Sequence, residues 1–402
     1  MRVVIVGAGP CGAALAVALA RAGTAVTLVE AAPGLGRSFR GEALMPSGLE
    51  ALERLGLAPV PETVPQRALG GWRVAVEGHD LFQVPEPLEG PGAQPCTLVS
   101  QPAWLESLLA ATQRPARLSV LLGMAVADLQ HNAEGRVSGV QLADGTQLPA
   151  DLVVGCDGRG SLLRRKADIA LSETAHPIDV LWFRFDAAAE ALPDQGFTTL
   201  VGPQGLASVF TSAEGRVQLG WAIPPGAPTP RHTAREWIDR LVAQAPQDLA
   251  GWLQRNGAHL GEPVRFSVQV GLAERWWQPG LLLLGDAAHP MSPVRAQGIN
   301  MALRDAALAS CTLLELASAG PVSAAQLDQA LARIEAARRP EVALLQALQA
   351  EELERAELLQ HKPWLRRLLA GFAPLVSKAA GRYWRLQQRR LRHGTAPLDT
   401  GQ

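Results

Sequence analysis

One short stretch of this chain combines an acid with the start of a helix, and these features could bind a ligand. Residues 281–284 are four leucines, which predicts a buried strand, and Gly285 and Asp286 follow them directly. A helical pattern then opens at Gln297-Gly298-Ile299-Asn300. The first turn of a helix presents unpaired N–H groups and partial positive charge. Asp286 and this helix start could therefore hold a ligand with hydroxyl groups at one end and a delocalised anion at the other.

The N-terminus carries a second candidate binding site. Residues 2–6 predict a buried strand, residues 7–12 (GAGPCG) match the pattern GxGxxG, and an Ala/Leu-rich helix follows. A second strand, residues 25–29, ends in Glu30. Glycines in such a turn let a pyrophosphate approach the backbone, and the acid accepts hydrogen bonds from ribose hydroxyls. No basic residue closely follows Glu30, which favours an unphosphorylated ribose, as in FAD or NAD. The predicted site consists of Gly7, Gly9, Pro10, Cys11, Gly12 and Glu30.

A third motif also places an acid after an apolar strand. Residues 151–165 (DLVVGCDGRGSLLRR) predict a buried strand, then Asp157-Gly158 and a turn. An acid in such a turn is often only structural, and that interpretation applies to Asp286 as well. The presence of all three motifs in one chain favours a dinucleotide site over three unrelated turns.

The remaining strand patterns predict a second sheet. Residues 71–84 alternate between apolar and polar types, as a hairpin does, and further strand patterns lie between residues 178 and 223. The expected fold class is α/β, with a Rossmann-type domain, an inserted antiparallel sheet and a C-terminal helical region. Trp182, Phe210 and Trp221 are candidates to line a substrate pocket, although each could instead be sheet core.

These patterns predict a discontinuous domain organisation. The nucleotide-binding domain would comprise residues 1–70, 98–170 and 271–350. The substrate domain would comprise residues 71–97 and 171–270, and residues 351–402 would form a helical, basic C-terminal tail.

Composition limits the function classes. The 402 residues have a formal net charge of −1, so no general basic field argues for a nucleic-acid partner. The four cysteines lack metal-binding spacing, which predicts no metal site and fits a reducing, cytoplasmic compartment. The apolar N-terminus resembles a signal peptide, but glycines interrupt it and a strand pattern follows. We expect a cytoplasmic protein, monomeric or homodimeric, that acts on a small molecule.

Residues 363–392 form a basic amphipathic run. Apolar side chains recur at helical spacing among eight arginine or lysine residues. One interpretation is contact with an anionic membrane surface. The other is a helix that packs on the body of the protein and leaves its basic face in water. The sequence favours the second interpretation and leaves the first open.

The three motifs, in this order, resemble those of the single-component flavoprotein monooxygenases of group A, the para-hydroxybenzoate hydroxylase type. The first is residues 7–12 with Glu30. The second, residues 157–164 (DGRGSLLR), looks like that family's DGxxSxxR. The third is Gly285-Asp286 with Pro293 and residues 297–300. The resemblance spans residues 1–350.

This resemblance implies that the ligand is FAD and that NADH or NADPH docks transiently as the reductant. Asp286 would bind the ribityl chain, and Pro293 would lie beside the flavin ring. The family usually has Gly where Ala296 stands, and a methyl group there could shift the loop. The cofactor-binding residues implied beyond the N-terminal motif are Arg40, Gln101, Asp157, Gly158, Gly285, Asp286, Pro293, Gln297, Gly298, Ile299 and Asn300.

The resemblance therefore implies an FAD-dependent, NAD(P)H-consuming monooxygenase. Such an enzyme would hydroxylate or epoxidise an apolar or aromatic small molecule through a flavin hydroperoxide, which a dry pocket protects. The chain has one tyrosine, Tyr383, in the basic run, so a tyrosine relay in the active site is not expected. Pro293 and His79 are the candidate catalytic residues.

Three other functions use the same motifs. A geranylgeranyl-reductase-like enzyme would reduce a double bond on the same FAD fold. A flavin-dependent halogenase is disfavoured because Leu219 replaces the first Trp of that group's WxWxIP motif and no lysine precedes Lys166. A flavin-binding module without catalysis would need only the binding motifs.

Overall fold

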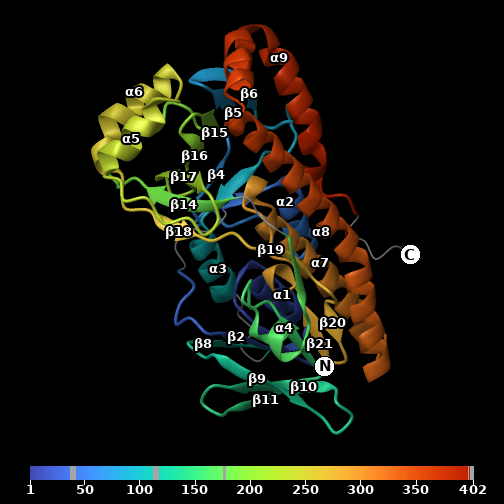
Figure 1. The fold of residues 1–402 in the computed structure, drawn as a ribbon. Helices are drawn as coiled ribbons and strands as arrows, with labels where there is room; N and C mark the ends of the chain where they lie inside the picture. The colour runs from blue at the N-terminus through green and yellow to red at the C-terminus, as the bar shows by residue number, and fades with distance from the viewer. Residues whose placement is uncertain (37–41, 112–116, 175–177, 397, 399–402) are drawn as a thin grey trace.

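The computed structural model describes residues 1–36, 42–111, 117–174, 178–396 and 398 (Figure 1). In this part of the chain, six strands form a sheet in the order β20-β21-β12-β1-β2-β8. Strand β20 is antiparallel to β21, and the other five strands are parallel. The strands are β1 (Arg2–Val6), β2 (Ala25–Glu30), β8 (Leu118–Leu122), β12 (Leu152–Gly155), β20 (Trp277–Gln278) and β21 (Leu281–Leu283).

Both faces of this sheet are covered, which explains why its strands are apolar at nearly every position. Val3 and Ile5 of β1 pack in one core cluster with helix α1 (Pro10–Arg21). Val4 and Val6 point to the other face and pack with residues of β9 and β10. The first face also holds α2 (Pro46–Arg54), α3 (Gln101–Ala110) and α7 (Gln297–Ser318); the second carries β9 (Val126–His131), β10 (Val137–Leu142) and β11 (Gln147–Pro149).

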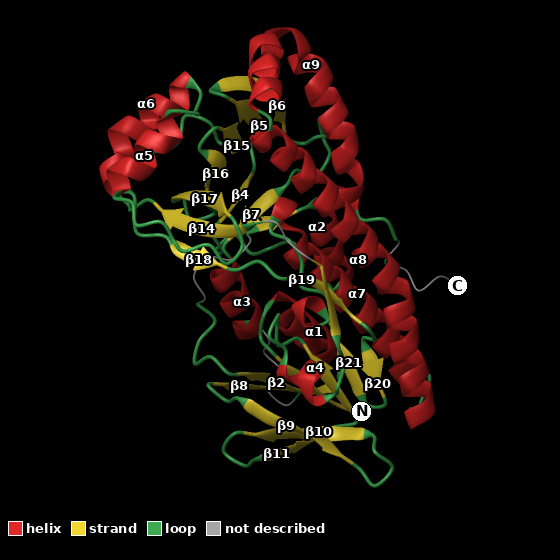
Figure 2. Cartoon of the chain, in the orientation of Figure 1, coloured by secondary structure: helices red, strands yellow, loops and turns green. Residues whose placement is uncertain are grey.

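A second, larger sheet lies beside the first (Figure 2). Its described strands follow the order β18-β14-β17-β16-β15-β5-β6, and all neighbours are antiparallel except β15 and β5. Helices α5 (Ala234–Val242) and α6 (Gln247–Asn256) cover one face. The strands are β5 (Gly71–Val76), β6 (His79–Pro85), β14 (Asp179–Arg184), β15 (Phe197–Gly202), β16 (Gly205–Thr211), β17 (Val217–Ile223) and β18 (Val264–Phe266).

Two long helices run along one side of the molecule (Figure 1). Helix α8 (Ala324–His361) continues through Pro340. Helix α9 (Pro363–His393) packs along β6, where the ring centroids of Trp384 and Phe82 lie 5.3 Å apart. In the described part of the chain, no helix is both long enough and apolar enough to cross a membrane.

Short elements connect these parts. Strands β3 (Ala43–Leu44), β4 (Gln66–Ala68) and β7 (Thr97–Val99) form a small sheet, and β13 (Leu171–Thr174) pairs with β19 (Val270–Ala273). Helix α4 (Leu162–Lys166) follows β12, and short 3-10 turns lie at Gly257–His259, Gly285–Ala287 and Val294–Ala296. The α/β class, with a parallel sheet, a largely antiparallel sheet and C-terminal helices, is confirmed.

Candidate functional site

The order of the strands places the three sequence motifs in one row. Strands β21, β12, β1 and β2 are neighbours, so their carboxyl ends meet at one edge of the sheet. Asp286 follows β21, Asp157 follows β12, the glycine loop follows β1, and Glu30 ends β2. Neighbouring strands lie about 4.8 Å apart, so the row extends roughly 14 Å from β21 to β2. This edge suits an extended ligand rather than a compact one.

The glycines of the first motif serve two different purposes. Gly7 has a φ of +102°, and a Cβ there would lie 2.3 Å from the Cys156 carbonyl oxygen. A Cβ on Gly12 would lie 2.0 Å from the Gly7 carbonyl oxygen. Both positions therefore need glycine for the fold itself. A Cβ on Gly9, in contrast, would meet no protein atom within 4 Å, so this space is open to a ligand at the start of α1.

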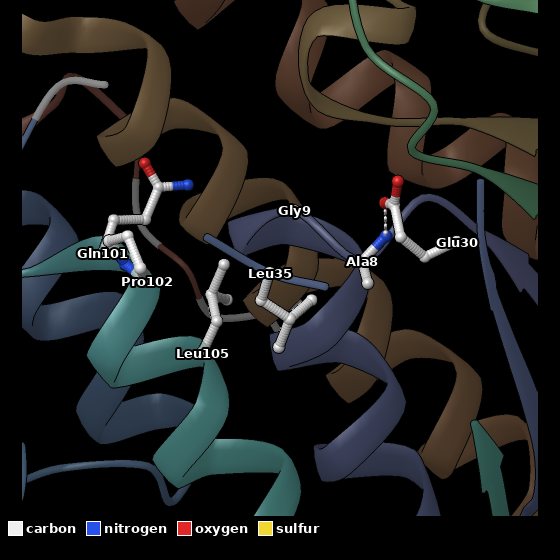
Figure 3. A pocket seen from close by; sticks show the side chains of 7 residues that line it. All are labelled: Ala8, Gly9, Glu30, Leu35, Gln101, Pro102 and Leu105. Atoms are coloured by element: carbon white, nitrogen blue, oxygen red, sulfur yellow. Dashed lines mark hydrogen bonds between the residues drawn. The ribbon is translucent and has the colours of Figure 1, made fainter. Parts of the chain in front are cut away.

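A small cavity joins Gly9 to Glu30 and Gln101 (Figure 3). Glu30 is buried; its Oε2 accepts a hydrogen bond of 2.9 Å from the Ala8 backbone N–H, and its Oε1 accepts one of 2.9 Å from the Ala32 N–H. Gln101 opens α3 on the opposite wall. The cavity is lined by Ala8, Gly9, Glu30, Leu35, Gln101, Pro102 and Leu105.

At the other end of the row, Asp286 and the start of α7 do converge. A Cβ on Gly298 would lie 3.7 Å from Asp286 Oδ1, and the Arg159 guanidinium lies 3.3 Å from Asp286 Oδ2. Within the described residues, no side chain caps the N-terminus of α7. The Gln297 Oε1 there is buried and has no hydrogen-bond partner among them. An acid, free N–H groups and a buried acceptor are thus available to a polar ligand, as a flavin's ribityl chain and pyrimidine edge require.

Asp157 acts on this site indirectly. Its carboxylate accepts hydrogen bonds from Ser161 Oγ at 2.6 Å and from the Leu163 N–H at 3.1 Å, which fixes the turn into α4. Arg164, buried in that helix, donates to the Ala287 carbonyl oxygen at 2.7 Å. The second motif therefore orders the segment that carries Asp286.

The side chain of Asn300 links α7 to the segment before α2 by hydrogen bonds. Its Oδ1 accepts a hydrogen bond of 2.8 Å from the Met45 N–H, and its Nδ2 donates to the Ala43 carbonyl oxygen at 3.1 Å. A Cβ on Gly48 would lie 2.1 Å from Asn300 Oδ1, so glycine is required there. These hydrogen bonds occupy both polar atoms of the Asn300 side chain, so only its backbone could bind a ligand.

The loop before α7 has an unusual backbone. Arg295 has a φ of +56° and Ala296 a φ of +51°, two consecutive left-handed residues without a glycine. The Arg295 guanidinium lies 4.8 Å from the ring centroids of both Trp72 and Trp384 and pairs with Glu352. These contacts hold the loop that follows the partly exposed Pro293.

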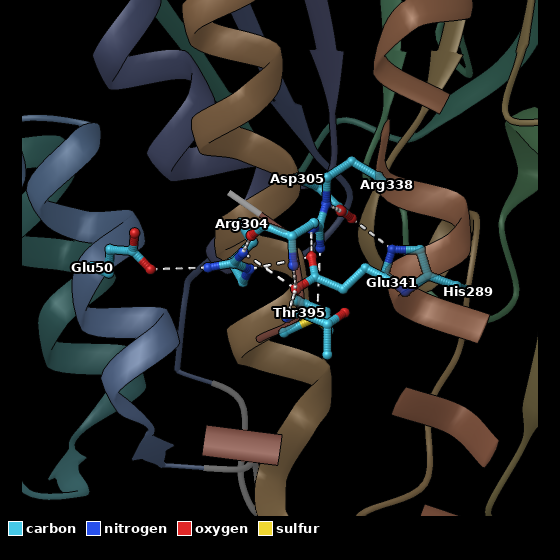
Figure 4. A network of polar contacts seen from close by, with 9 residues as sticks. Glu50, His289, Arg304, Asp305, Arg338, Glu341 and Thr395 are labelled. Atoms are coloured by element: carbon cyan, nitrogen blue, oxygen red, sulfur yellow. Dashed lines mark hydrogen bonds and ion pairs between the residues drawn. The ribbon is translucent and has the colours of Figure 1, made fainter. Parts of the chain in front are cut away.

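A buried network of polar side chains stabilises the segment that carries Asp286 (Figure 4). Asp305 Oδ2 accepts a hydrogen bond of 3.0 Å from the Gly285 N–H and lies 2.6 Å from His289 Nε2. Asp305 Oδ1 accepts one of 2.8 Å from Arg338 Nε. Burial alone would raise the pKa of Asp305. His289 and Arg338 lower it by a larger amount, so the pKa is about 2. The network continues through Arg338, Glu341 and Arg304 to Glu50, and the Thr395 N–H donates to Glu341.

The three predicted pocket aromatics do not share a face of the second sheet. Trp182 and Phe210 lie 5.9 Å apart on the face without α5 and α6, and Phe197 stacks on Phe210 at 5.2 Å. Trp221 points to the opposite face and packs on Trp237 of α5 at 5.2 Å. Trp221 is therefore core, because side chains alternate along a strand and the register puts Trp221 opposite Leu181 rather than Trp182.

The structure places two other predicted residues, His79 and Cys11. His79 is exposed at the β5–β6 turn, next to Gly78, whose Cβ would lie 3.4 Å from the Ala245 carbonyl oxygen on the α5–α6 side. A hydrogen bond with Cys156 and burial raise the pKa of the Cys11 thiol well above its ordinary value, so Cys11 is a small neutral core residue. Arg40 lies outside the described residues.

Sequence reasoning missed Glu42, which directly precedes β3 and binds residues in and just before β17. Its carboxylate accepts hydrogen bonds from the Ala213 N–H at 2.9 Å and from Gln218 Nε2 at 3.4 Å. Burial raises the pKa of Glu42. Gln218 also accepts a hydrogen bond of 2.7 Å from the Trp182 indole N–H, so Glu42 is connected to the aromatic face. No local pattern marks this acid, because its partners are more than 170 residues away.

Comparison with known proteins identifies the ligand for this geometry. The model of the FAD binding domain family matches residues 1–340. The chain is 32% identical to 6-methylpretetramide 4-monooxygenase of Streptomyces rimosus, over 98% of this chain and 93% of that protein. It is 27% identical to menaquinone reductase of Mycolicibacterium smegmatis, over 80% of this chain and 77% of that protein.

A solved structure shares the fold. PqsL of P. aeruginosa, in complex with 2-aminobenzoylacetate, superimposes with a TM-score of 0.74 at 25% identity, over 92% of this chain and 98% of that chain. The matched residues 1–340 include the glycine loop, Asp157, Asp286 and the start of α7. The chain therefore belongs to the FAD binding domain family and is an FAD-dependent monooxygenase of group A.

Proposed function

We propose that this monooxygenase consumes NADH or NADPH and hydroxylates or epoxidises an apolar, aromatic small molecule through a flavin hydroperoxide. One observation supports this most. Trp72 belongs to the aromatic face of the second sheet and contacts Arg295, which stands two residues before α7. The end of the FAD row at Asp286 and α7 thus adjoins an aromatic cluster, in which Trp72 and Phe210 are buried. An oxidisable ring would bind against the partly buried members of this cluster, Trp182 and Phe197.

The side chains on that surface favour a flat apolar substrate. Trp72, Phe197, Phe210 and Trp182 form a continuous row, with neighbouring ring centroids 5.2 to 5.9 Å apart. Such rings attract another aromatic ring by offset or edge contacts. The relative from Streptomyces rimosus is named for oxygenating 6-methylpretetramide, and we extend only the reaction type to this chain.

Several residues of this chain would have distinct roles in binding the flavin and the substrate. The N–H groups at the start of α7 would stabilise negative charge on the reduced flavin, and Asp286 would orient its polyol chain. Bound FAD supplies the electron transfer and oxygen chemistry. Pro293, in the loop before α7, would lie beside the ring. Gln218, which is bonded to Trp182, and its partner Glu42 could orient a substrate hydroxyl.

A double-bond reductase is the second candidate, because the chain is also similar to a menaquinone reductase. Both reactions use the same FAD site, so the motifs do not separate them. For either reaction we propose a cytoplasmic enzyme, because four cysteines without metal-binding spacing suit a reducing compartment. We also propose that the enzyme is monomeric or homodimeric.

Isotope-labelled oxygen distinguishes these reactions. The purified protein, loaded with FAD, is supplied with NADPH or NADH and a panel of fused-ring aromatic and isoprenoid quinone substrates. A monooxygenase incorporates one labelled oxygen atom into its product and makes none without oxygen. A product that forms anaerobically and gains two hydrogens would establish the reductase instead.

A further inference from the structure

Helix α9 has an apolar stripe that no part of the described chain covers. Its residues recur every three or four positions except for one interval of eight, about two helical turns, between Leu375 and Tyr383, so they lie on one side of the helix. Trp364 is 64% exposed, Leu375 80% and Leu386 72%. The exposed stripe consists of Trp364, Leu368, Phe372, Leu375, Tyr383 and Leu386.

This stripe is distinct from the side of α9 that packs on the protein. The buried side holds Ala370, Ala373, Gly381 and Leu391, and a Cβ on Gly381 would lie 3.2 Å from Val84 of β6. At about 100° per residue, the stripe occupies a sector of roughly 100° opposite the buried side, and it extends about 33 Å along the helix. Helix α9 therefore packs on the protein with one side, as the sequence favoured, and leaves a second apolar side exposed.

Positive charge lies along the edge of the stripe. Helix α9 contains eight arginine or lysine residues and no aspartate or glutamate. The whole chain has a net charge of −1, so this helix concentrates charge that the rest of the protein balances. Two of the eight, Arg366 and Arg392, are buried and paired with Glu77 and with Glu86 and Glu89. The exposed basic residues are Arg367, Lys378, Arg382, Arg385, Arg389 and Arg390.

We propose that α9 docks the enzyme on an anionic phospholipid surface. An apolar stripe with aromatic residues and a basic border is the pattern of a helix that lies in the lipid interface, where its apolar side enters the acyl boundary. Each Arg or Lys near an anionic surface adds attraction, and the absence of acids in α9 leaves this uncompensated. A second copy of the chain is a poorer partner, because two identical α9 faces would bring like charges together.

Vesicle sedimentation tests this proposal with the FAD-loaded full chain. The probes are phosphatidylcholine vesicles with and without about 30 mol% phosphatidylglycerol. We expect at least tenfold stronger binding to the anionic vesicles, and weaker binding at high salt. Phe372→Glu with Leu375→Glu should reduce binding at least tenfold. Val264→Glu, which replaces an exposed apolar residue of β18 (47% exposed), should leave binding unchanged.

A variant with two arginines neutralised separates the electrostatic contribution to vesicle binding from the apolar one. Arg385→Gln with Arg389→Gln should lower binding to anionic vesicles at least tenfold and leave any residual binding to neutral vesicles unchanged. These side chains are exposed and lie outside the candidate site, so FAD content and turnover of the purified variants should match wild type.

Three results would overturn the proposal. The first is equal or undetectable binding to both kinds of vesicle. The second is loss of binding in Val264→Glu to the same extent as in the α9 variant. The third is a wild-type dimer that Phe372→Glu with Leu375→Glu dissociates while neither form binds vesicles, which would assign the stripe to a second copy.

Discussion

Gly9 and Gly12 belong to one motif but have different surroundings. A side chain at Gly12 would collide with the Gly7 carbonyl oxygen at 2.0 Å, whereas a Cβ at Gly9 meets no protein atom within 4 Å. We expect Gly9→Val to fold with a free energy of unfolding within about 0.5 kcal/mol of wild type. It should bind FAD at least tenfold more weakly, because the side chain enters the pyrophosphate space.

Gly12→Ala is the matched control. It should destabilise the apoprotein strongly, because backbone must move. Urea unfolding and fluorescence titration with FAD measure both variants. A Gly9→Val protein with unchanged FAD affinity would show that the pyrophosphate does not pass this residue.

Ala296 adopts a conformation that favours glycine. Its φ of +51° costs a residue with a side chain roughly 1 kcal/mol, and the family usually has glycine here. Ala296→Gly should raise the free energy of unfolding by about 0.5–1 kcal/mol, with the entropy of glycine offsetting part of the gain. Ala347→Gly, at an exposed position in the interior of α8, should lower it by a similar amount. Equal losses in both variants in urea unfolding would show that Ala296 carries no strain.

At the scale of elements, the buried network makes the segment before α7 sensitive to acid. The pKa of Asp305 is about 2, below the ordinary value near 3.9, so ionised Asp305 stabilises the folded state above pH 4. This contribution, about 2 kcal/mol, is lost as the pH falls from 4 towards 2. Asp305→Asn should therefore destabilise the protein by at least this amount at pH 7, and the difference from wild type should shrink below pH 4.

Unfolding by urea at a series of pH values measures this difference. Asp239→Asn, an exposed change on α5, should follow wild type throughout. A constant difference between Asp305→Asn and wild type from pH 7 to pH 3 would contradict the assignment of a lowered pKa to Asp305.

Helix α9 also reaches the loop beside the expected flavin ring. Trp384 stacks on the Arg295 guanidinium, and Gln388 donates to Glu352, the partner of Arg295, at 3.3 Å. Trp384→Leu should free this loop, so FAD affinity should fall about threefold to tenfold, equivalent to roughly 1 kcal/mol for the lost cation–π contact. More NAD(P)H should be oxidised for each product formed. Leu386→Ala, exposed on the same helix, should match wild type; if both variants do so, the contact does not position the loop.

At the scale of the whole molecule, elements built from consecutive residues could be predicted from the sequence. Contacts between residues far apart in the sequence could not. Strand β1, the glycine turn and α1 are consecutive, so periodicity and glycine spacing were enough to predict them. The convergence of Asp286 with α7 was also predictable, because only ten residues separate Asp286 from Gln297. The face of Trp221 was not, since it depends on the register between β14 and β17. Glu42, Arg295 and Arg304 have partners more than 30 residues away in the sequence, and no pattern in the sequence marks these pairs.

The arrangement of sheets and helices connects three tasks. The parallel sheet aligns the FAD motifs, Trp72 of the second sheet contacts Arg295 in the loop before α7, and Trp384 of α9 contacts the same arginine. The exposed side of the same helix is the surface for which we propose lipid contact. The FAD motifs and the aromatic cluster therefore lie on either side of the loop that precedes α7.

The most direct test of this account is the affinity of Asp286→Ala for FAD. Asp286 faces Gly298 at the start of α7 and is not part of the buried network, so the variant should fold. Equilibrium titration of apoprotein with FAD should give a dissociation constant at least tenfold above wild type, as expected for the loss of a hydrogen bond to a charged group. Asp239→Ala should be unchanged. If Asp286→Ala binds FAD as tightly as wild type, the flavin does not lie between Asp286 and α7, and the central assignment is wrong.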